Sequence, residues 1–295
     1  MSPTDETATS ERSSSDRPSA ERSPAEHSAD ASLPKRFAAL FALGMVGVVA
    51  VGVVTATGEG GVPGLPAASA PELALLVTIQ PTILLAVATL VGVLLAPRVG
   101  LRSHVEARVR GGPPVSTALR PELRRAVGVG AAAFFATIAL DALFAPFTAA
   151  DLAAATPAPD AGTLSALLAS LPVRLLYGGV TEEILLRWGL LTLFAWTIHA
   201  VRARVGDERA TLARSSAWTA ILLSAVLFGV GHLPALATVT EPTTELVVRT
   251  VALNAVAGIG FGWLYWRDSL EAAMVSHATF HVVLVGLSAL AVVVG

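Results

Sequence analysis

The sequence predicts an all-α membrane protein, a polytopic transmembrane helical bundle with about seven to eight membrane helices. Hydrophobic residues make up 54% of the 295-residue chain, and charged residues only 14%. The mean hydropathy is positive. Apolar runs recur along the chain at about 20 residues, the length that a helix needs to cross a hydrocarbon core of about 30 Å. Together these observations place the chain among membrane proteins.

Composition divides the chain into two parts. Residues 1–34 are rich in Ser, Pro, Ala, Glu and Asp and lack apolar periodicity, so we expect a disordered N-terminal tail. Residues 35–295 then form the integral membrane helical domain. The formal net charge of −2 gives no basic excess that would favour nucleic acid. The chain has no cysteine, which excludes disulfides, cysteine-ligated metals and a thiol nucleophile.

Six apolar runs have the length of single membrane spans. They lie at about 37–57, 73–96, 126–147, 216–237, 246–266 and 270–293. The region 163–201 is longer, because about 39 residues rise ~58 Å as an α-helix. We expect this region to break at Pro172 or at Gly178-Gly179. It would then give one net crossing plus a helix within or along the bilayer, or else two further crossings.

Basic residues alternate between the loops. The loop 97–125 carries seven Arg and the loop 202–215 carries four, whereas 58–72, 148–162 and 238–245 contain no Lys or Arg. Cytoplasmic loops of membrane proteins are enriched in Lys and Arg. We therefore expect a cell-membrane protein with its N-terminus in the cytoplasm and its C-terminus outside.

The first polar cluster within the apolar spans is "EEILLR". An ionisable group in hydrocarbon costs about 2.5–3.5 kcal/mol, so such groups pair or carry out chemistry. Glu183 and Arg187 stand four residues apart in the order that favours an intrahelical ion pair, which explains both without any function. Glu182 lies ~100° around the helix and is not explained by that pair. A carboxylate in apolar surroundings suits proton transfer.

Two further clusters contain histidine. In "LFGVGHLP", Phe228 and His232 share a helix face, and His232 alone is most simply a core histidine bonded to backbone. In "MVSHATFHVV", His277 and His281 are four apart, a spacing that can chelate one metal ion. Carboxylate and imidazole groups from three spans are what a zinc-type site or a water-activating Glu–His pair needs. This combination predicts hydrolysis with one glutamate as general base.

The remaining ionisable or amide side chains in the spans have no assigned chemistry, and we expect them to pair between helices. They are Asp141, Arg174, Arg249 and Asn254.

The three clusters, in this order, resemble the CAAX protease and bacteriocin-processing family of intramembrane proteases, also called the Abi family or type II CAAX prenyl endopeptidase-like proteins. The family pattern is E-E-x-x-x-R, then F-x-x-x-H, then H-x-x-x-N or a close variant. This chain has "EEILLR" at 182–187, "FGVGH" at 228–232 and "HATFH" at 277–281. The resemblance covers about 163–293.

The resemblance implies an intramembrane endopeptidase, with the lipid bilayer and a membrane-anchored peptide or protein as partners. Cleavage would be of the CAAX type or would process a leader or propeptide. By motif position Glu182 would activate water, with Glu183 supporting it. His232 would work with Glu182 or hold a metal, and His277 would bind metal or stabilise the oxyanion. Arg187 would be structural.

The cofactor stays open at this point. His232, His277 and His281 are candidate ligands for a divalent metal such as zinc, whereas a metal-free mechanism needs only glutamate and histidine to activate water. His281 stands where the family usually has Asn. It can donate to an oxyanion or serve as a third ligand, with Phe228 as a supporting residue beside the site.

Two other classes of function fit the same residues. A non-catalytic membrane scaffold or bacteriocin-immunity protein of the same fold would keep the Glu183–Arg187 pair and not need Glu182. A proton-coupled transporter would use buried Glu and His as a relay. Against a transporter, broken helices do not recur in two matching halves of the sequence.

Helix depth sets a geometric condition on any shared site. His277 is about seven residues into its span, ~10 Å from the cytoplasmic end, and His232 is about sixteen residues from Ser216, ~24 Å. For the two histidines to meet, the 216–237 helix must begin lower, tilt or break near Pro234.

Overall fold

The computed structural model describes residues 32–57, 69–155, 162–206 and 212–294, so almost all of the predicted tail at 1–34 lies outside the described residues. Within these ranges the chain forms helices and no strand. Among the residues of these ranges, seven helices are long and apolar enough to cross a membrane. The predicted all-α fold is therefore confirmed, and the chain is an integral membrane protein.

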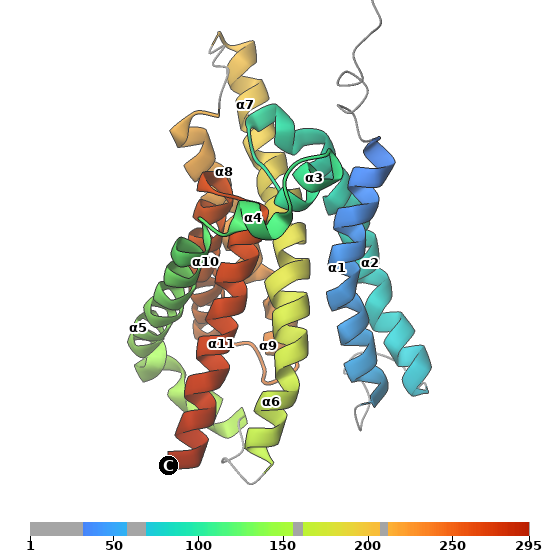
Figure 1. Cartoon of the computed structure of the whole chain (residues 1–295). Helices are drawn as coiled ribbons and strands as arrows, with labels where there is room; N and C mark the ends of the chain where they lie inside the picture. Colours follow the sequence, from blue (N-terminus) through green and yellow to red (C-terminus); the bar gives the residue numbers. More distant parts are fainter. Residues whose placement is uncertain (1–31, 58–68, 156–161, 207–211, 295) are drawn as a thin grey trace, which may run out of the picture.

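The candidate spans match the apolar runs of the sequence in order. They are α1 (Leu33–Thr57), α2 (Ala70–Leu95) with η2 (Ala96–Val99), α5 (Leu123–Ala155), a helix over Thr163–Arg204, α8 (Arg214–Val230) with α9 (Leu233–Ala237), α10 (Thr244–Arg267) and α11 (Leu270–Val294). Figure 1 shows them packed side by side as one bundle.

The break expected within 163–201 is wrong. One continuous helical path of 42 residues crosses the whole bundle (Figure 1). It consists of α6 (Thr163–Val173), η3 (Arg174–Glu182), η4 (Ile184–Leu191) and α7 (Thr192–Arg204). The segments η3 and η4 are π-helical, and their wide turns with i→i+5 hydrogen bonds keep the chain helical past Gly178-Gly179. The surplus length projects beyond the bundle as α7, which ends on Arg202 and Arg204.

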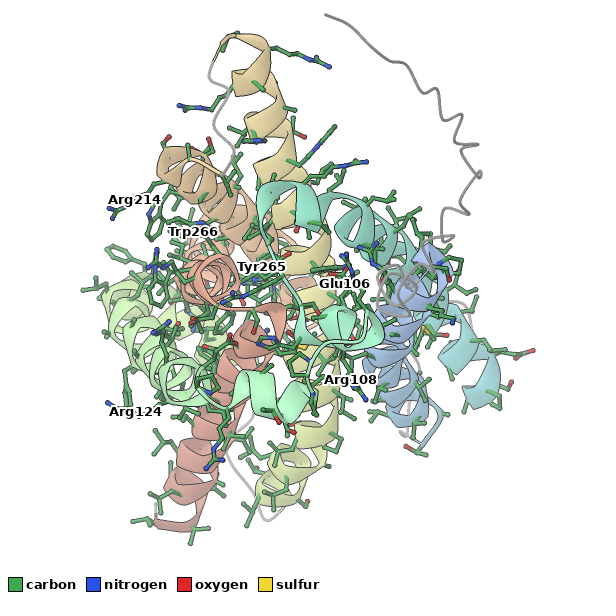
Figure 2. All side chains as sticks on the ribbon, turned by 45° about the horizontal axis from the view of Figure 1, so that its top comes forward. Glu106, Arg108, Arg124, Arg214, Tyr265 and Trp266 are labelled. Carbon is green, nitrogen blue, oxygen red and sulfur yellow. The ribbon has the colours of Figure 1, made fainter. Side chains whose placement is uncertain are left out.

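The basic segments gather at one end of the bundle. Two short helices that the sequence did not predict, α3 (His104–Val109) and α4 (Val115–Leu119), lie across that end, and α7 extends past it (Figure 1). Arg124 and Arg214 project outward from the periphery (Figure 2). The C-terminus lies at the opposite end. This arrangement fits the alternation of basic loops, and the cytoplasmic position of the basic end stays a prediction.

A carboxylate from α11 holds α3 in place. The two oxygens of Glu271 accept hydrogen bonds from Ser103 Oγ at 2.6 Å and from the backbone N–H groups of His104 and Val105 at 2.8 and 2.9 Å. Unpaired N–H groups at a helix N-terminus favour a negative charge, so this contact caps α3. It also fixes where α11 begins, seven residues before His277.

Gly47 brings α1 into backbone contact with η3. A Cβ atom at this position would collide with the carbonyl oxygen of Leu176 and with Thr181 Oγ1. Thr181 Oγ1 also donates a hydrogen bond of 2.6 Å to the carbonyl oxygen of Gly44. Helix α1 therefore packs directly against the π-helical segment that ends at Glu182.

We expect Gly47→Ala to destabilise the protein by about 1–3 kcal/mol, because the atoms that meet the new methyl group are mainly backbone and cannot rotate away. The matched control is Gly128→Ala in α5, where a Cβ would meet no atom within 4 Å. The measurement is thermal unfolding of both purified variants in one detergent. Equal unfolding temperatures would show that α1 does not need this close approach.

Candidate active site

The two adjacent glutamates occupy different surroundings. Glu183 is fully buried, with 0% of its surface exposed. Glu182 is half-buried and lines a cavity between helices. Neighbouring residues of a helix point in different directions, so one carboxylate enters the packed interior while the other reaches open space. The sequence-based separation of the two side chains agrees with this placement.

Glu183 lies at the centre of a buried polar network. Its Oε1 is 3.0 Å from Arg187 Nη1, which confirms the predicted intrahelical pair, and 2.8 Å from His277 Nδ1. Arg187 Nη2 donates to the carbonyl oxygen of Gly258 at 3.1 Å. A carboxylate only accepts hydrogen bonds, so Nδ1 of His277 carries a proton, and in the neutral ring Nε2 presents a lone pair.

Aromatic rings enclose this network. The guanidinium carbon of Arg187 lies 4.8 Å from the ring centre of Phe228 and 5.3 Å from that of Phe261. The His277 ring stacks on Phe261 at 4.5 Å. Arginine over aromatic faces in a desolvated site gains about 2 kcal/mol or more per contact. These contacts join η4 to α8, α10 and α11, as a structural role for Arg187 requires.

His232 stands where α8 gives way to α9. Its Nδ1 lies 2.8 Å from the carbonyl oxygen of Phe228, and its ring meets the edge of the Phe228 ring at 4.7 Å. A carbonyl oxygen only accepts, so Nδ1 donates and the neutral ring offers the lone pair of Nε2. Pro234, at the start of α9, cannot donate to the preceding turn, which favours the break here.

This break meets the geometric condition that the different depths of His232 and His277 set. Helix α8 ends at Val230, close to the expected break near Pro234. The Phe228 ring then lies 5.8 Å from the His277 ring while it also touches His232. The second and third motifs of the sequence therefore meet through one phenylalanine.

Two cavities meet at this point. One, of about 400 Å³, is lined by Glu182, His232, Tyr177 and Gln80 among others. The other, of about 270 Å³, is lined by His277 and His281 and also by His232. Phe228 and His232 line both cavities and so separate them. The larger cavity thus brings Glu182 and His232 together, and the smaller cavity brings His232, His277 and His281 together.

Of the remaining polar side chains of the spans, Asp141 and Arg249 pair between helices as expected, whereas the expectation is wrong for Arg174 and Asn254. Arg249 Nε of α10 donates to Asp141 Oδ1 of α5 at 2.6 Å. Arg174 Nε donates to Ser170 Oγ at 2.9 Å, and Asn254 Nδ2 donates to the Thr250 carbonyl oxygen at 2.8 Å. These last two contacts are within one helical path rather than between helices.

Residues 164–283 match the sequence model of the family described as Type II CAAX prenyl endopeptidase Rce1-like. This stretch is an Rce1-like domain. It begins with the second residue of the 163–204 helix, ends within α11, and contains all three motifs, so the resemblance seen in the sequence is confirmed. Helices α1 to α5 lie outside the match. No curated protein and no solved structure matches the chain.

The Rce1-like domain does not assemble the predicted metal ligands. Within the ranges that the structure describes, no group of three or more His, Cys, Asp or Glu is arranged to hold a metal ion. His277 already donates Nδ1 to Glu183, and its ring stacks on that of His281 at 4.8 Å. A structural or catalytic zinc needs at least three converging protein ligands. The donor set as placed does not fit one.

We expect Arg187→Met to destabilise the Rce1-like domain by about 3–5 kcal/mol, because it leaves the buried charge of Glu183 without its cation. Glu183→Gln should cost a similar amount for the reverse reason. The double variant leaves no unpaired charge and should lose less than the sum of the two single losses. Thermal or denaturant unfolding of all four proteins in the same detergent gives the coupling. Strictly additive losses would contradict a direct ion pair.

Proposed function

We propose that the protein is an intramembrane endopeptidase that hydrolyses a peptide bond of a membrane-anchored peptide or protein. The observation that carries the proposal is the shared cavity of Glu182 and His232, which lies beside the buried Glu183–Arg187 ion pair. The Rce1-like domain supports it, since the three motifs lie within the matched residues. The room of about 400 Å³ accommodates a water molecule beside an extended peptide segment.

Two acceptors in that cavity select and orient the attacking water. The carboxylate of Glu182 accepts one O–H, and Nε2 of neutral His232 accepts the other, because its Nδ1 is held by the Phe228 carbonyl oxygen. The lone pair of the water oxygen then points at the substrate carbonyl carbon. As the C–O bond forms, Glu182 takes the proton as general base.

The same proton completes the reaction. Glu182, now protonated, passes it to the amide nitrogen, and the C–N bond of the tetrahedral intermediate breaks. The products are a peptide carboxylic acid and an amine, so one water is consumed and no oxidant or reductant is needed. Glu183 and Arg187 act one step away: they fix His277 and the Phe228 wall, and thereby the position of His232.

We expect Glu182→Gln and His232→Ala each to lower cleavage at least about 100-fold, the contribution of a positioned base. Both variants should still insert in the membrane. The matched control is Glu245→Gln, which removes an exposed carboxylate in the first turn of α10. The readout is cleavage in nanodiscs of a panel: a quenched peptide with a farnesylated cysteine near its C-terminus, its unmodified counterpart, and a single-span membrane peptide.

Unchanged cleavage in both variants would refute the proposal. The remaining candidate would be a membrane scaffold or immunity protein, in which the Glu183–Arg187 pair holds the fold and Glu182 is not needed. Loss of cleavage in Glu245→Gln as well would point to a general fault of folding rather than to the cavity.

We expect removal of divalent metal to leave the rate within about twofold, because Glu182 and His232 accept hydrogen bonds from the two O–H groups of the water and Glu182 alone takes a proton. The protein is treated with a chelator, dialysed, and assayed on the same panel with and without added zinc. A loss of activity that zinc restores would show instead that the histidines rearrange to bind metal.

A further inference from the structure

The π-helical turn places a tyrosine beside the proposed base. In an α-helix, residues five apart are turned roughly 140° from each other, so Tyr177 and Glu182 would face different sides. The i→i+5 hydrogen bonds of a π-helix bring such residues to the same side. Both line the 400 Å³ cavity. Thr181 supports this conformation, since its Oγ1 bonds the Leu176 carbonyl oxygen five residues earlier at 3.3 Å.

Tyr177 lines the cavity. Among the described residues its hydroxyl makes no hydrogen bond, and that hydroxyl is not one of the polar atoms sealed in the interior. Its ring is half-buried against the core. The chain's other tyrosine, Tyr265, is fully buried and bonded to Thr192 at 2.8 Å. A phenol in an apolar setting usually finds a partner, so a free one at this place is available to substrate.

The proposed reaction needs a donor that the histidines do not supply. His232 and His277 both place Nδ1 against protein acceptors, so in the neutral form of each ring Nε2 presents a lone pair rather than a donor. His281 lines the second cavity and not the one that holds Glu182. Gln80 also lines the cavity and is exposed, so it is the competing donor that the test must separate from Tyr177.

We propose that Tyr177 is a catalytic residue whose hydroxyl donates a hydrogen bond to the substrate carbonyl oxygen as that oxygen becomes an oxyanion. The inference rests on the proposed function and adds a residue to the same site. The phenol keeps its proton throughout. The hydrogen bond strengthens as negative charge builds on the oxygen and weakens when the C–N bond breaks, so it stabilises the transition state more than the bound substrate.

The test is Tyr177→Phe, which keeps the ring and removes only the hydroxyl. We expect kcat to fall about 10²–10³-fold, the usual effect of losing one oxyanion donor, with KM changed less than about threefold. The matched control is Tyr265→Phe, which removes a fully buried hydroxyl that is bonded to Thr192. It should lower the unfolding temperature and leave kcat unchanged. The assay uses the same peptide panel in nanodiscs.

The outcomes separate this inference from the proposed function. If Glu182→Gln abolishes cleavage while Tyr177→Phe leaves kcat unchanged or alters KM alone, Tyr177 is not the donor and the protease proposal stands. A fall in kcat for Gln80→Leu in place of Tyr177→Phe assigns the donor to Gln80 and also overturns the inference. If the wild-type protein cleaves no member of the panel, both proposals fail.

Discussion

A single buried carboxylate holds the Rce1-like domain together. Glu183 has no access to solvent, so its charge must be balanced by protein groups, and Arg187 and His277 provide that balance at 3.0 and 2.8 Å. Because these groups come from two separate helical paths and the arginine also reaches the Gly258 carbonyl on a third, the position of one charge fixes three helices at once. An ion pair at this depth gains little over an apolar substitute, but it tolerates only one arrangement.

The π-helical segments η3 and η4 place the neighbouring residues Glu182 and Glu183 in different surroundings. Glu183 turns into the packed interior and pairs through Oε1 with Arg187 and His277, whereas Glu182 turns into a cavity and has no protein partner among the described residues. Tyr177 joins Glu182 because a π turn aligns residues five apart. The close approach of Gly47 and the hydrogen bond from Thr181 to Gly44 hold this uncommon backbone in place from α1.

Polar side chains that pair with other protein groups therefore differ in position from those that line the larger cavity. The groups that build the fold are paired: Glu183 with Arg187, Asp141 with Arg249, and Glu271 with the start of α3. The groups that face the larger cavity keep free donors or acceptors, which costs stability in an apolar setting. Under the proposed function, that cost is recovered when water and a peptide occupy the cavity. The break between α8 and α9 adds the lone pair of His232 to the same space.

The sequence by itself determined the seven apolar spans, the Glu183–Arg187 pair and the three motifs of the Rce1-like domain, because these depend on local hydrophobicity and on helical spacing. Only the tertiary structure decided the continuous 42-residue helix, the capping of α3 by Glu271 and the place of Tyr177 beside Glu182. Each of these depends on long-range packing or on a π turn, and neither leaves a periodic pattern in the residues. The sequence singled out the three histidines, but their ring nitrogens are assigned by partners on other turns and helices, so their fit to a metal was decided by packing.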